Sequence, residues 1–129
     1  MTTYRLLTEK LFDGESIQHH QVLTISDGVI TSIDSDPTDI DCSVDGTLVP
    51  GFVDLQVNGG GGVLFNDSPS LDNLTTIITA HARYGTTGML PTLITDKLEV
   101  MTQAADAVAQ AIAVKVPGIL GIHFEGPHL

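Results

Sequence analysis

The stretch PGFVDLQVNGGGG, residues 50–62, divides the sequence into two parts with different patterns. After the Pro-Gly pair, residues 52–57 carry apolar side chains at alternate positions, which is typical of a β-strand. The glycine run that follows lets the chain turn sharply or approach a ligand closely. We therefore predict a strand over 52–57 and a boundary between two domains, residues 1–50 and residues 51–129.

The N-terminal part has the pattern of short strands joined by turns. Residues 21–25 and 29–33 are rich in β-branched side chains and flank the pair Asp27-Gly28, which is a strong signal for a β-hairpin. Five aspartates lie between residues 34 and 45 without a basic residue among them, and they predict a solvated acidic loop. We expect this part to be a β-rich segment.

The C-terminal part alternates between strand and helix patterns. Strands are predicted over 89–93 and 119–124. One helix is predicted to start at Ser68-Pro69, with the serine as N-cap and the proline at the first helical position. A second is predicted after Asp96, which forms a capping-box pattern with Glu99. Strands that alternate with helices favour a parallel sheet in an α/β fold.

Composition and charge exclude several classes of function. The chain has 129 residues, of which 42% are hydrophobic, and its net charge is −11. Such an acidic protein lacks the basic surface that binds nucleic acid or anionic membranes. No apolar run reaches the roughly 18 residues of a membrane span. The single cysteine rules out an intramolecular disulfide, so we expect a cytoplasmic protein.

Polar side chains gather at the ends of two predicted strands. Asp54, Gln56 and Asn58 alternate and therefore share a face, and so do His123 and Glu125. In parallel α/β folds, sites collect at the carboxyl ends of strands. The first group is either a structural hydrogen-bond network or part of a site. Glu125 beside His123 is either a buried ion pair or a candidate for metal binding and acid–base chemistry.

Four motifs together resemble one enzyme family. They are, in order, PGFVDLQVNGGGG (50–62), LFND (64–67), GTTGMLPTLIT (85–95) and GIHFEGPHL (121–129). In this order and spacing they resemble the N-acetylglucosamine-6-phosphate deacetylase family of the amidohydrolase superfamily. Residues 25–33 are also similar to the N-terminal segment of that superfamily.

The resemblance implies a fold and a reaction. It implies that residues 51–129 are the first three β/α units of a metal-dependent hydrolase (β/α)8 TIM barrel. It implies that residues 1–50 belong to a small β-sandwich built from both chain ends. The implied reaction is hydrolysis of the acetamide of N-acetylglucosamine 6-phosphate, which yields glucosamine 6-phosphate and acetate. The implied partners are this small-molecule amino sugar phosphate and, for the full-length protein, a second copy in a homodimer.

The resemblance also implies one divalent metal ion, with zinc favoured and iron or another divalent metal as alternatives. In the family the glutamate of the H-x-E-G-P motif binds the metal, which corresponds to Glu125. Many amidohydrolases have His-x-His where this sequence has Gln56 and Asn58, and neutral amides are poorer zinc ligands than imidazole. We therefore expect a single metal, with Gln56, Asn58 and His123 lining the site.

The remaining family residues are expected beyond Leu129. These are two histidine ligands, the catalytic aspartate and the phosphate-binding residues. The chain is accordingly expected to be an incomplete N-terminal part that is inactive alone. Two alternatives are a different metal-dependent amidohydrolase and a non-catalytic remnant that folds by oligomerising.

Overall fold

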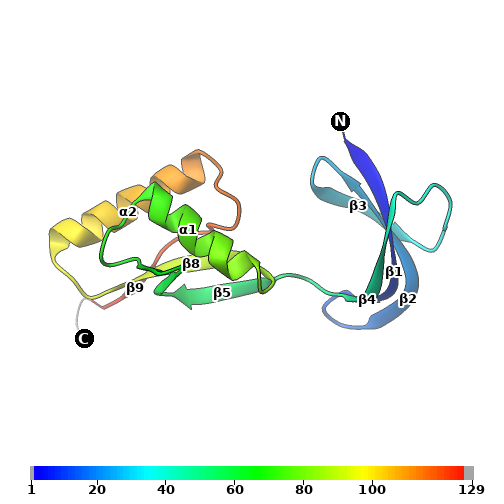
Figure 1. Ribbon diagram of the computed structural model, residues 1–129, viewed down its shortest axis with the longest axis horizontal. Coiled ribbons are helices and arrows are strands. Elements are labelled where there is room, and N and C mark those ends of the chain that lie inside the picture. The colour runs from blue at the N-terminus through cyan, green and yellow to red at the C-terminus, as the bar shows by residue number, and fades with distance from the viewer. Residues whose placement is uncertain (1, 127–129) are drawn as a thin grey trace. The chain divides into compact units, whose positions relative to one another are not determined.

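The computed structural model describes residues 2–126 and divides into two compact units, Met1–Pro50 and Gly51–Leu129 (Figure 1). The division falls at the Pro-Gly pair where the sequence pattern changes. Pro127 and His128 of the last motif lie outside the described residues.

The N-terminal unit is one four-stranded sheet. Its strands are β1 (Thr3–Phe12), β2 (Ile17–Ser26), β3 (Val29–Asp34) and β4 (Cys42–Leu48), in the spatial order β3-β2-β1-β4. Neighbours pair antiparallel except β1 and β4, which are parallel. The described residues of this unit form a single sheet, so the second layer of a sandwich stays a prediction.

The predicted hairpin is confirmed, but the strands are longer than the sequence indicated. Strands β2 and β3 pair antiparallel across Asp27-Gly28. Few of the described side chains of this unit are buried; they are Thr8, Leu11, Val22 and Leu23. A small core of this kind buries little apolar surface and contributes correspondingly little hydrophobic stabilisation.

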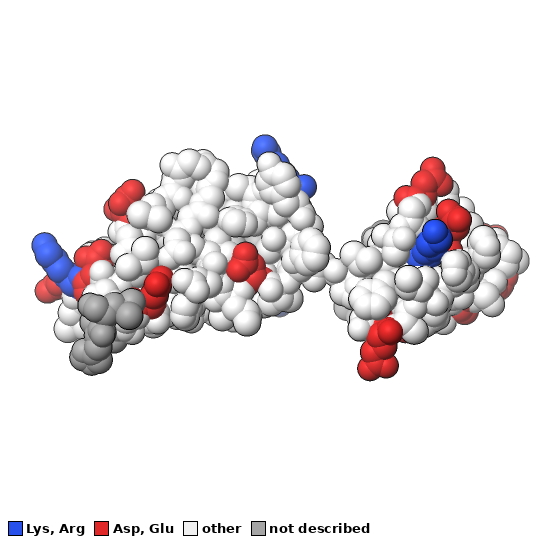
Figure 2. Space-filling view, turned by 90° about the horizontal axis from the view of Figure 1, so that it is seen from below, with Lys and Arg blue, Asp and Glu red and all other residues white. Residues whose placement is uncertain are grey.

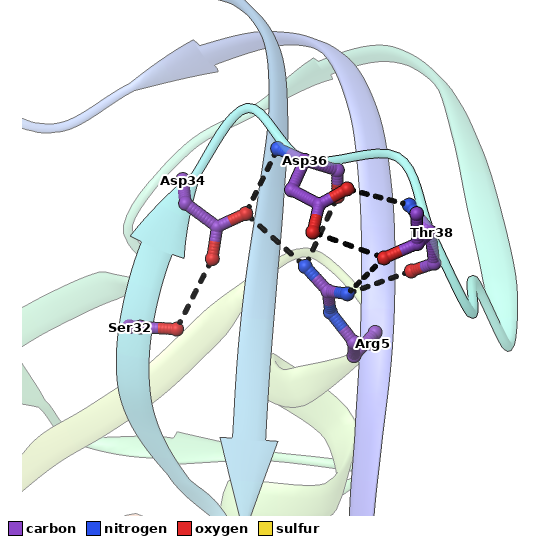
Figure 3. A network of polar contacts seen from close by, with 5 residues as sticks. All are labelled: Arg5, Ser32, Asp34, Asp36 and Thr38. Atoms are coloured by element: carbon purple, nitrogen blue, oxygen red, sulfur yellow. Dashed lines mark hydrogen bonds and ion pairs between the residues drawn. The ribbon is translucent and has the colours of Figure 1, made fainter.

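Arg5 organises the acidic loop that follows β3 (Figure 3). Its Nη2 lies 3.1 Å from Asp34 Oδ1 and donates to the Asp36 carbonyl at 3.0 Å. Its Nη1 donates to the Thr38 carbonyl at 2.7 Å, and its backbone N–H donates to Asp41 Oδ2 at 2.8 Å. The Thr38 N–H, then the Thr38 hydroxyl, and finally the Arg5 charge hold the pKa of Asp36 below its usual value. The loop predicted to be merely solvated is therefore tied to β1.

The C-terminal unit is a parallel sheet with two helices. Strands β5 (Phe52–Val57), β8 (Thr86–Ile94) and β9 (His123–Glu125) lie in that spatial order, and both pairings are parallel. Helix α1 (Leu71–Ala82) connects β5 to β8, and helix α2 (Leu98–Ala113) connects β8 to β9. Figure 1 shows both helices over the same face of the sheet. The predicted parallel α/β arrangement is confirmed.

The hydrophobic core of this unit lies between the helices and the sheet. Met89 and Leu93 occupy alternate positions of β8 and are almost completely buried. They belong to one cluster with Leu74 and Ile77 of α1 and Val108 of α2. Burying a side chain of this size contributes about 1.5–3 kcal/mol relative to leaving it exposed. The core of this unit therefore forms where the inner faces of both helices meet the sheet.

A short hairpin separates β5 from α1. It consists of β6 (Gly59–Gly60) and β7 (Val63–Leu64), paired antiparallel. Gly61 and Gly62 form its tip with φ angles of 63° and 86°, where residues with a side chain are strained. The carbonyl of Gly59 lies 3.0 Å from His81 Nε2 on α1. The glycine run thus has a structural role, and His81 packs against it.

Helix α1 begins two residues later than predicted. Ser70, not Ser68, is the N-cap, and its Oγ accepts a hydrogen bond from the Asn73 N–H at 3.3 Å. Pro69 precedes the cap and is not the first helical residue, which is Leu71. Both serines satisfied the local pattern, and the packing of the helix selected between them.

The capping box predicted for α2 is wrong. The N-cap is Lys97, which makes no side-chain capping bond. The Asp96 carboxylate instead accepts from the Lys97 N–H at 2.8 Å and from Asn66 Nδ2 at 3.1 Å. The bond from the Lys97 N–H has the larger effect and that from Asn66 the smaller, and both keep the pKa of Asp96 below its usual value. Glu99 lies in the first turn of the helix, where a negative charge is favourable.

The N-cap assignment makes a testable prediction. Ser70→Ala should lower the stability of the chain by about 1 kcal/mol, because the Asn73 N–H loses its acceptor at the helix start. Ser68→Ala is the matched control and should leave stability unchanged, since Ser68 uses its backbone carbonyl to accept from Asn73 Nδ2. Urea unfolding of the two variants measures the difference. Equal losses in both would refute Ser70 as the cap.

Strands β8 and β9 differ in length from the predictions. β8 extends on both sides of the predicted 89–93 and includes Pro91 in its interior. The pairing register with β5 shifts beside this proline, which cannot donate to the ladder. β9 is shorter than the predicted 119–124, although Ile119 forms an isolated bridge with Met89.

The described surface is predominantly acidic or neutral. On the face drawn in Figure 2, Asp and Glu side chains are scattered, and the Lys and Arg side chains do not gather into a patch. None of the helices in residues 2–126 has the length and apolarity that crossing a membrane requires.

Candidate functional site

The carboxyl ends of β5, β8 and β9 meet at one edge of the parallel sheet, and each brings polar side chains there. Gln56 lies at the end of β5, Thr92 near the end of β8, and His123 and Glu125 on β9. Alternation along each strand places these side chains on the sheet face opposite the one that Met89 and Leu93 pack against the helices. This edge is the candidate site.

Gln56 and Glu125 are in contact across the central strand. Gln56 Nε2 donates a hydrogen bond to Glu125 Oε2 at 3.2 Å, although the residues are 69 positions apart in the chain. Strands two places apart in a sheet are separated by about 9.5 Å, a gap that two long side chains can bridge. The structure therefore brings together two of the residues that the sequence singled out.

His123 is held through its Nδ1 atom. Thr92 Oγ1 lies 3.1 Å from this nitrogen, and the two residues are direct partners in the β8–β9 register. The same threonine oxygen accepts from the Val57 N–H at 3.0 Å. Thr92 is completely buried. His123 therefore faces the site with a fixed ring whose Nδ1 is already engaged.

Thr95 fixes the backbone at Glu125. Its N–H and its hydroxyl each donate to the Glu125 carbonyl at 2.9 Å. The next residue, Gly126, has a φ of 123°, and a Cβ there would overlap the Thr95 hydroxyl. Only glycine fits this approach without moving the strand end. The position of the Glu125 side chain thus depends on its immediate neighbours.

Asn58 is not brought into contact with Glu125. Its Nδ2 is buried and has no hydrogen-bond partner among the described residues. Its carbonyl accepts from the Phe65 N–H at 2.8 Å, which anchors the loop after the glycine hairpin. An unpartnered buried amide is costly. Asn58 therefore has an unused donor at the candidate site.

Asn66, within the LFND motif, is a residue whose role sequence reasoning missed. Its side-chain amide mimics a neighbouring strand: Nδ2 donates to the Ile94 carbonyl at 2.9 Å, and Oδ1 accepts from the Ile94 N–H at 3.0 Å. This pairing holds the loop between β7 and α1 against the end of β8. The signal in the sequence was the polar Asn-Asp pair after an apolar run, but the pair did not indicate its partner.

Within residues 2–126, no set of three or more His, Cys, Asp or Glu side chains is arranged to hold a metal. Zinc in a catalytic site usually has three protein ligands. Glu125 offers one carboxylate, and its hydrogen bond from Gln56 is the kind of outer contact that orients a metal ligand. The donor set therefore fits one ligand of a metal site and not a whole site. The predicted role of Glu125 stays a prediction.

Comparisons with known proteins identify relatives along the whole chain. No protein-family model matches. The N-acetylgalactosamine-6-phosphate deacetylase of Shewanella sp. (strain ANA-3) is 47% identical over 138 residues, which cover 99% of this chain and 35% of that protein. The N-acetylglucosamine-6-phosphate deacetylase of Haemophilus influenzae is 39% identical over 82 residues, which cover 64% of this chain and 22% of that protein.

Solved structures give the same result. The crystal structure of N-acetylglucosamine-6-phosphate deacetylase from Pasteurella multocida matches with a TM-score of 0.90 and 30% identity, over 99% of this chain and 35% of that one. A mutant of the enzyme from Mycobacterium smegmatis, in complex with N-acetyl-D-glucosamine-6-phosphate, matches with a TM-score of 0.86 and 27% identity. That match covers 100% of this chain and 34% of the other.

The chain spans about a third of the length of the relatives that it matches from end to end. Its sequence and its fold agree on the same group of proteins, and the motifs at the strand ends lie within the matched region. Over 99% of its residues the chain is therefore similar to the N-acetylglucosamine- and N-acetylgalactosamine-6-phosphate deacetylases, and it corresponds to about one third of their length.

Proposed function

We propose that the protein containing this chain is an amidohydrolase that removes the acetyl group from an N-acetylhexosamine 6-phosphate. The products are the hexosamine 6-phosphate and acetate. The observation that carries the proposal is 47% identity to a named deacetylase over 99% of the chain. N-acetylglucosamine 6-phosphate is the substrate that the sequence motifs indicate.

N-acetylgalactosamine 6-phosphate is the second candidate substrate. The relative with 47% identity carries that name, whereas the relative at 39% identity is named for the glucosamine compound. The two sugars differ only in the configuration of one hydroxyl group, on carbon 4 of the ring. Discrimination between them depends on a hydrogen-bonding partner for that hydroxyl, and such partners can discriminate strongly because an unpaired buried polar group is costly.

For the complete fold we propose a (β/α)8 barrel in which residues 51–129 supply the first three strands. Support comes from three consecutive parallel strands, each adjacent to the next along the chain, with their helices on one face. Apolar side chains of the edge strands, among them Val53, Leu55 and Phe124, are exposed within the described residues. Parallel sheets are ordinarily covered on both faces, and further strands and helices would cover these side chains.

We also propose one divalent metal at the candidate site, with zinc favoured and iron or another divalent metal as alternatives. Glu125 would hold it, and further ligands would come from outside the described residues. When bound, the metal supplies a water of lowered pKa and polarises the amide carbonyl. The amides of Gln56 and Asn58 are weak ligands, which favours a single metal.

The chain's own residues would prepare the site. Gln56 restrains the Glu125 carboxylate by donating to Oε2, which leaves Oε1 free of hydrogen bonds from the described residues. Thr95 holds the Glu125 backbone, so the carboxylate moves little when a ligand arrives. His123 presents Nε2 to the same edge, because Thr92 occupies Nδ1. Such restraint of a site before the substrate binds is a major contribution to catalysis.

The experiment is to measure acetate release from both sugar phosphates. The protein expressed from its complete reading frame, supplied with zinc or iron, should release one acetate for each amine formed from at least one of them. The ratio of kcat/KM for the two compounds assigns the substrate. Release from neither, with metal bound, would reject the deacetylase function and favour a different amidohydrolase. A folded protein that binds no metal would favour the non-catalytic alternative.

A further inference from the structure

Thr92 lies where three strands of the candidate site are joined by hydrogen bonds. The Val57 N–H on β5 donates to its hydroxyl oxygen at 3.0 Å. Nδ1 of His123 on β9 lies 3.1 Å from the same oxygen, and the Leu90 carbonyl of β8 itself lies 3.3 Å away. A hydroxyl has one proton and two acceptor lone pairs. These three neighbours therefore use its hydrogen-bonding capacity fully.

The Val57 contact has a reason in the register of the sheet. Val57 lies opposite Pro91, and the pairing of β5 with β8 is irregular between Asp54 and Val57. Proline cannot donate to the ladder, so regular pairing is interrupted beside it. The Thr92 side chain supplies an acceptor for the Val57 N–H at this interruption, and no hydrocarbon side chain of the same shape could do so.

The contacts around Thr92 link the three strands in a ring that begins and ends at Thr92. Thr92 holds Val57, whose chain neighbour Gln56 donates to Glu125. Glu125 lies two residues after His123, on the same face of β9, and the His123 ring contacts Thr92 again. Loss of the Thr92 hydroxyl therefore loosens both the β5 and the β9 sides of the site.

We propose that Thr92 is a positioning residue of this site. Its hydroxyl fixes the His123 ring through Nδ1, so that Nε2 is the nitrogen presented at the carboxyl edge, and it keeps that ring in register with the strand that carries Gln56. The consequence for activity rests on the proposed deacetylase function, whereas the consequence for the His123 ring does not.

The test compares Thr92→Val, which keeps the shape and removes the hydroxyl, with Thr92→Ser, which keeps the hydroxyl. Thr87→Val is the matched control, because Thr87 lies at the opposite end of β8, is exposed and makes only a 3.5 Å contact with the Phe52 carbonyl. The first readout is the ¹⁵N spectrum of the histidine rings in metal-free protein expressed from the complete reading frame. The His123 signals are assigned by their loss in His123→Gln.

The hydroxyl-dependent role predicts a distinct pattern. Thr92→Val should shift the His123 ring nitrogens and lower kcat for acetate release about 10–100-fold with a smaller change in KM, because a small displacement of groups that line a site reduces the rate strongly. Thr92→Ser should retain the ring signals and stay within about threefold of the parent, as should Thr87→Val. A Thr92→Val protein with parental ring signals and parental kcat would overturn the proposal.

A measurement on the unmodified protein covers the case in which Thr92→Val does not fold. The proton shared by Thr92 and His123 should exchange slowly with solvent, because the hydroxyl is completely buried. A proton that exchanges at the rate of a free side chain would refute the contact. If no acetate is released from any substrate, the ring spectra still decide the positioning role, so failure of the function and failure of this proposal are distinguishable.

Discussion

Replacing Glu125 by glutamine is expected to remove most of the bound divalent metal and to lower kcat/KM for acetate release by more than ~100-fold. Loss of a residue that only contacts a metal ligand typically lowers activity by up to ~100-fold, and loss of the ligand itself should have a larger effect. The substitution conserves size and can still accept the hydrogen bond from Gln56. It removes the negative charge, and a neutral amide is a much poorer ligand for a divalent ion. Metal content by elemental analysis and steady-state kinetics measure the two effects.

Two further variants separate the role of the charge from general damage. Gln56→Leu removes the 3.2 Å contact between Gln56 and Glu125. It should lower kcat/KM by less, about 10–100-fold, because the carboxylate remains but is free to rotate. Glu99→Gln makes the same chemical change at an exposed position in the first turn of α2 and should bind metal like the parent. Full metal occupancy in Glu125→Gln would exclude Glu125 as a ligand, while the acetate assay would still judge the function.

Replacing Phe65 by alanine is expected to have the largest effect on stability, a loss of about 3–5 kcal/mol. Phe65 is completely buried in the cluster formed by the helices and the sheet, in the loop between β7 and α1. Its removal leaves a cavity that the surrounding side chains fill only in part. Urea unfolding measures the change, provided that the slope of the transition stays constant.

The matched control is Phe52→Ala at the start of β5, where the ring is 63% exposed. This change should cost under about 1 kcal/mol, as for most surface substitutions. Equal losses at the two positions would mean that Phe65 does not anchor the loop. The result also bears on the site, because the Phe65 N–H holds the carbonyl of Asn58.

The local pattern of the sequence was sufficient for the elements of the C-terminal unit. The strand predicted over 52–57 is found as Phe52–Val57, and both helices lie where apolar residues recur at helical spacing. Periodicity succeeds here because each element has one face against the core, and that face repeats with the geometry of the element. The hairpin at Asp27-Gly28 was also predicted correctly, because its signal lies in the residues of the turn itself.

The predicted helix starts were wrong because several neighbouring residues satisfy the same local rule. Ser68 and Ser70 are equally good N-caps in isolation, and only the position of the packed helix selects Ser70. Asp96 has the chemistry of a cap, yet its carboxylate is used by Lys97 and by Asn66, which lies 30 residues away. The competing partner comes from another loop and leaves no trace in the sequence around residue 96.

The sequence by itself determined the order of strands and helices, the resemblance to the deacetylases, and the faces on which Gln56, His123 and Glu125 lie. Only the tertiary structure decided that Gln56 reaches Glu125 across β8, and that Thr92 joins His123 to Val57. The physical reason is that alternation along a strand sets the face of a side chain but not its partner. Partners follow from the register of parallel strands, which is established when α1 and α2, the helices that connect these strands, pack against the sheet.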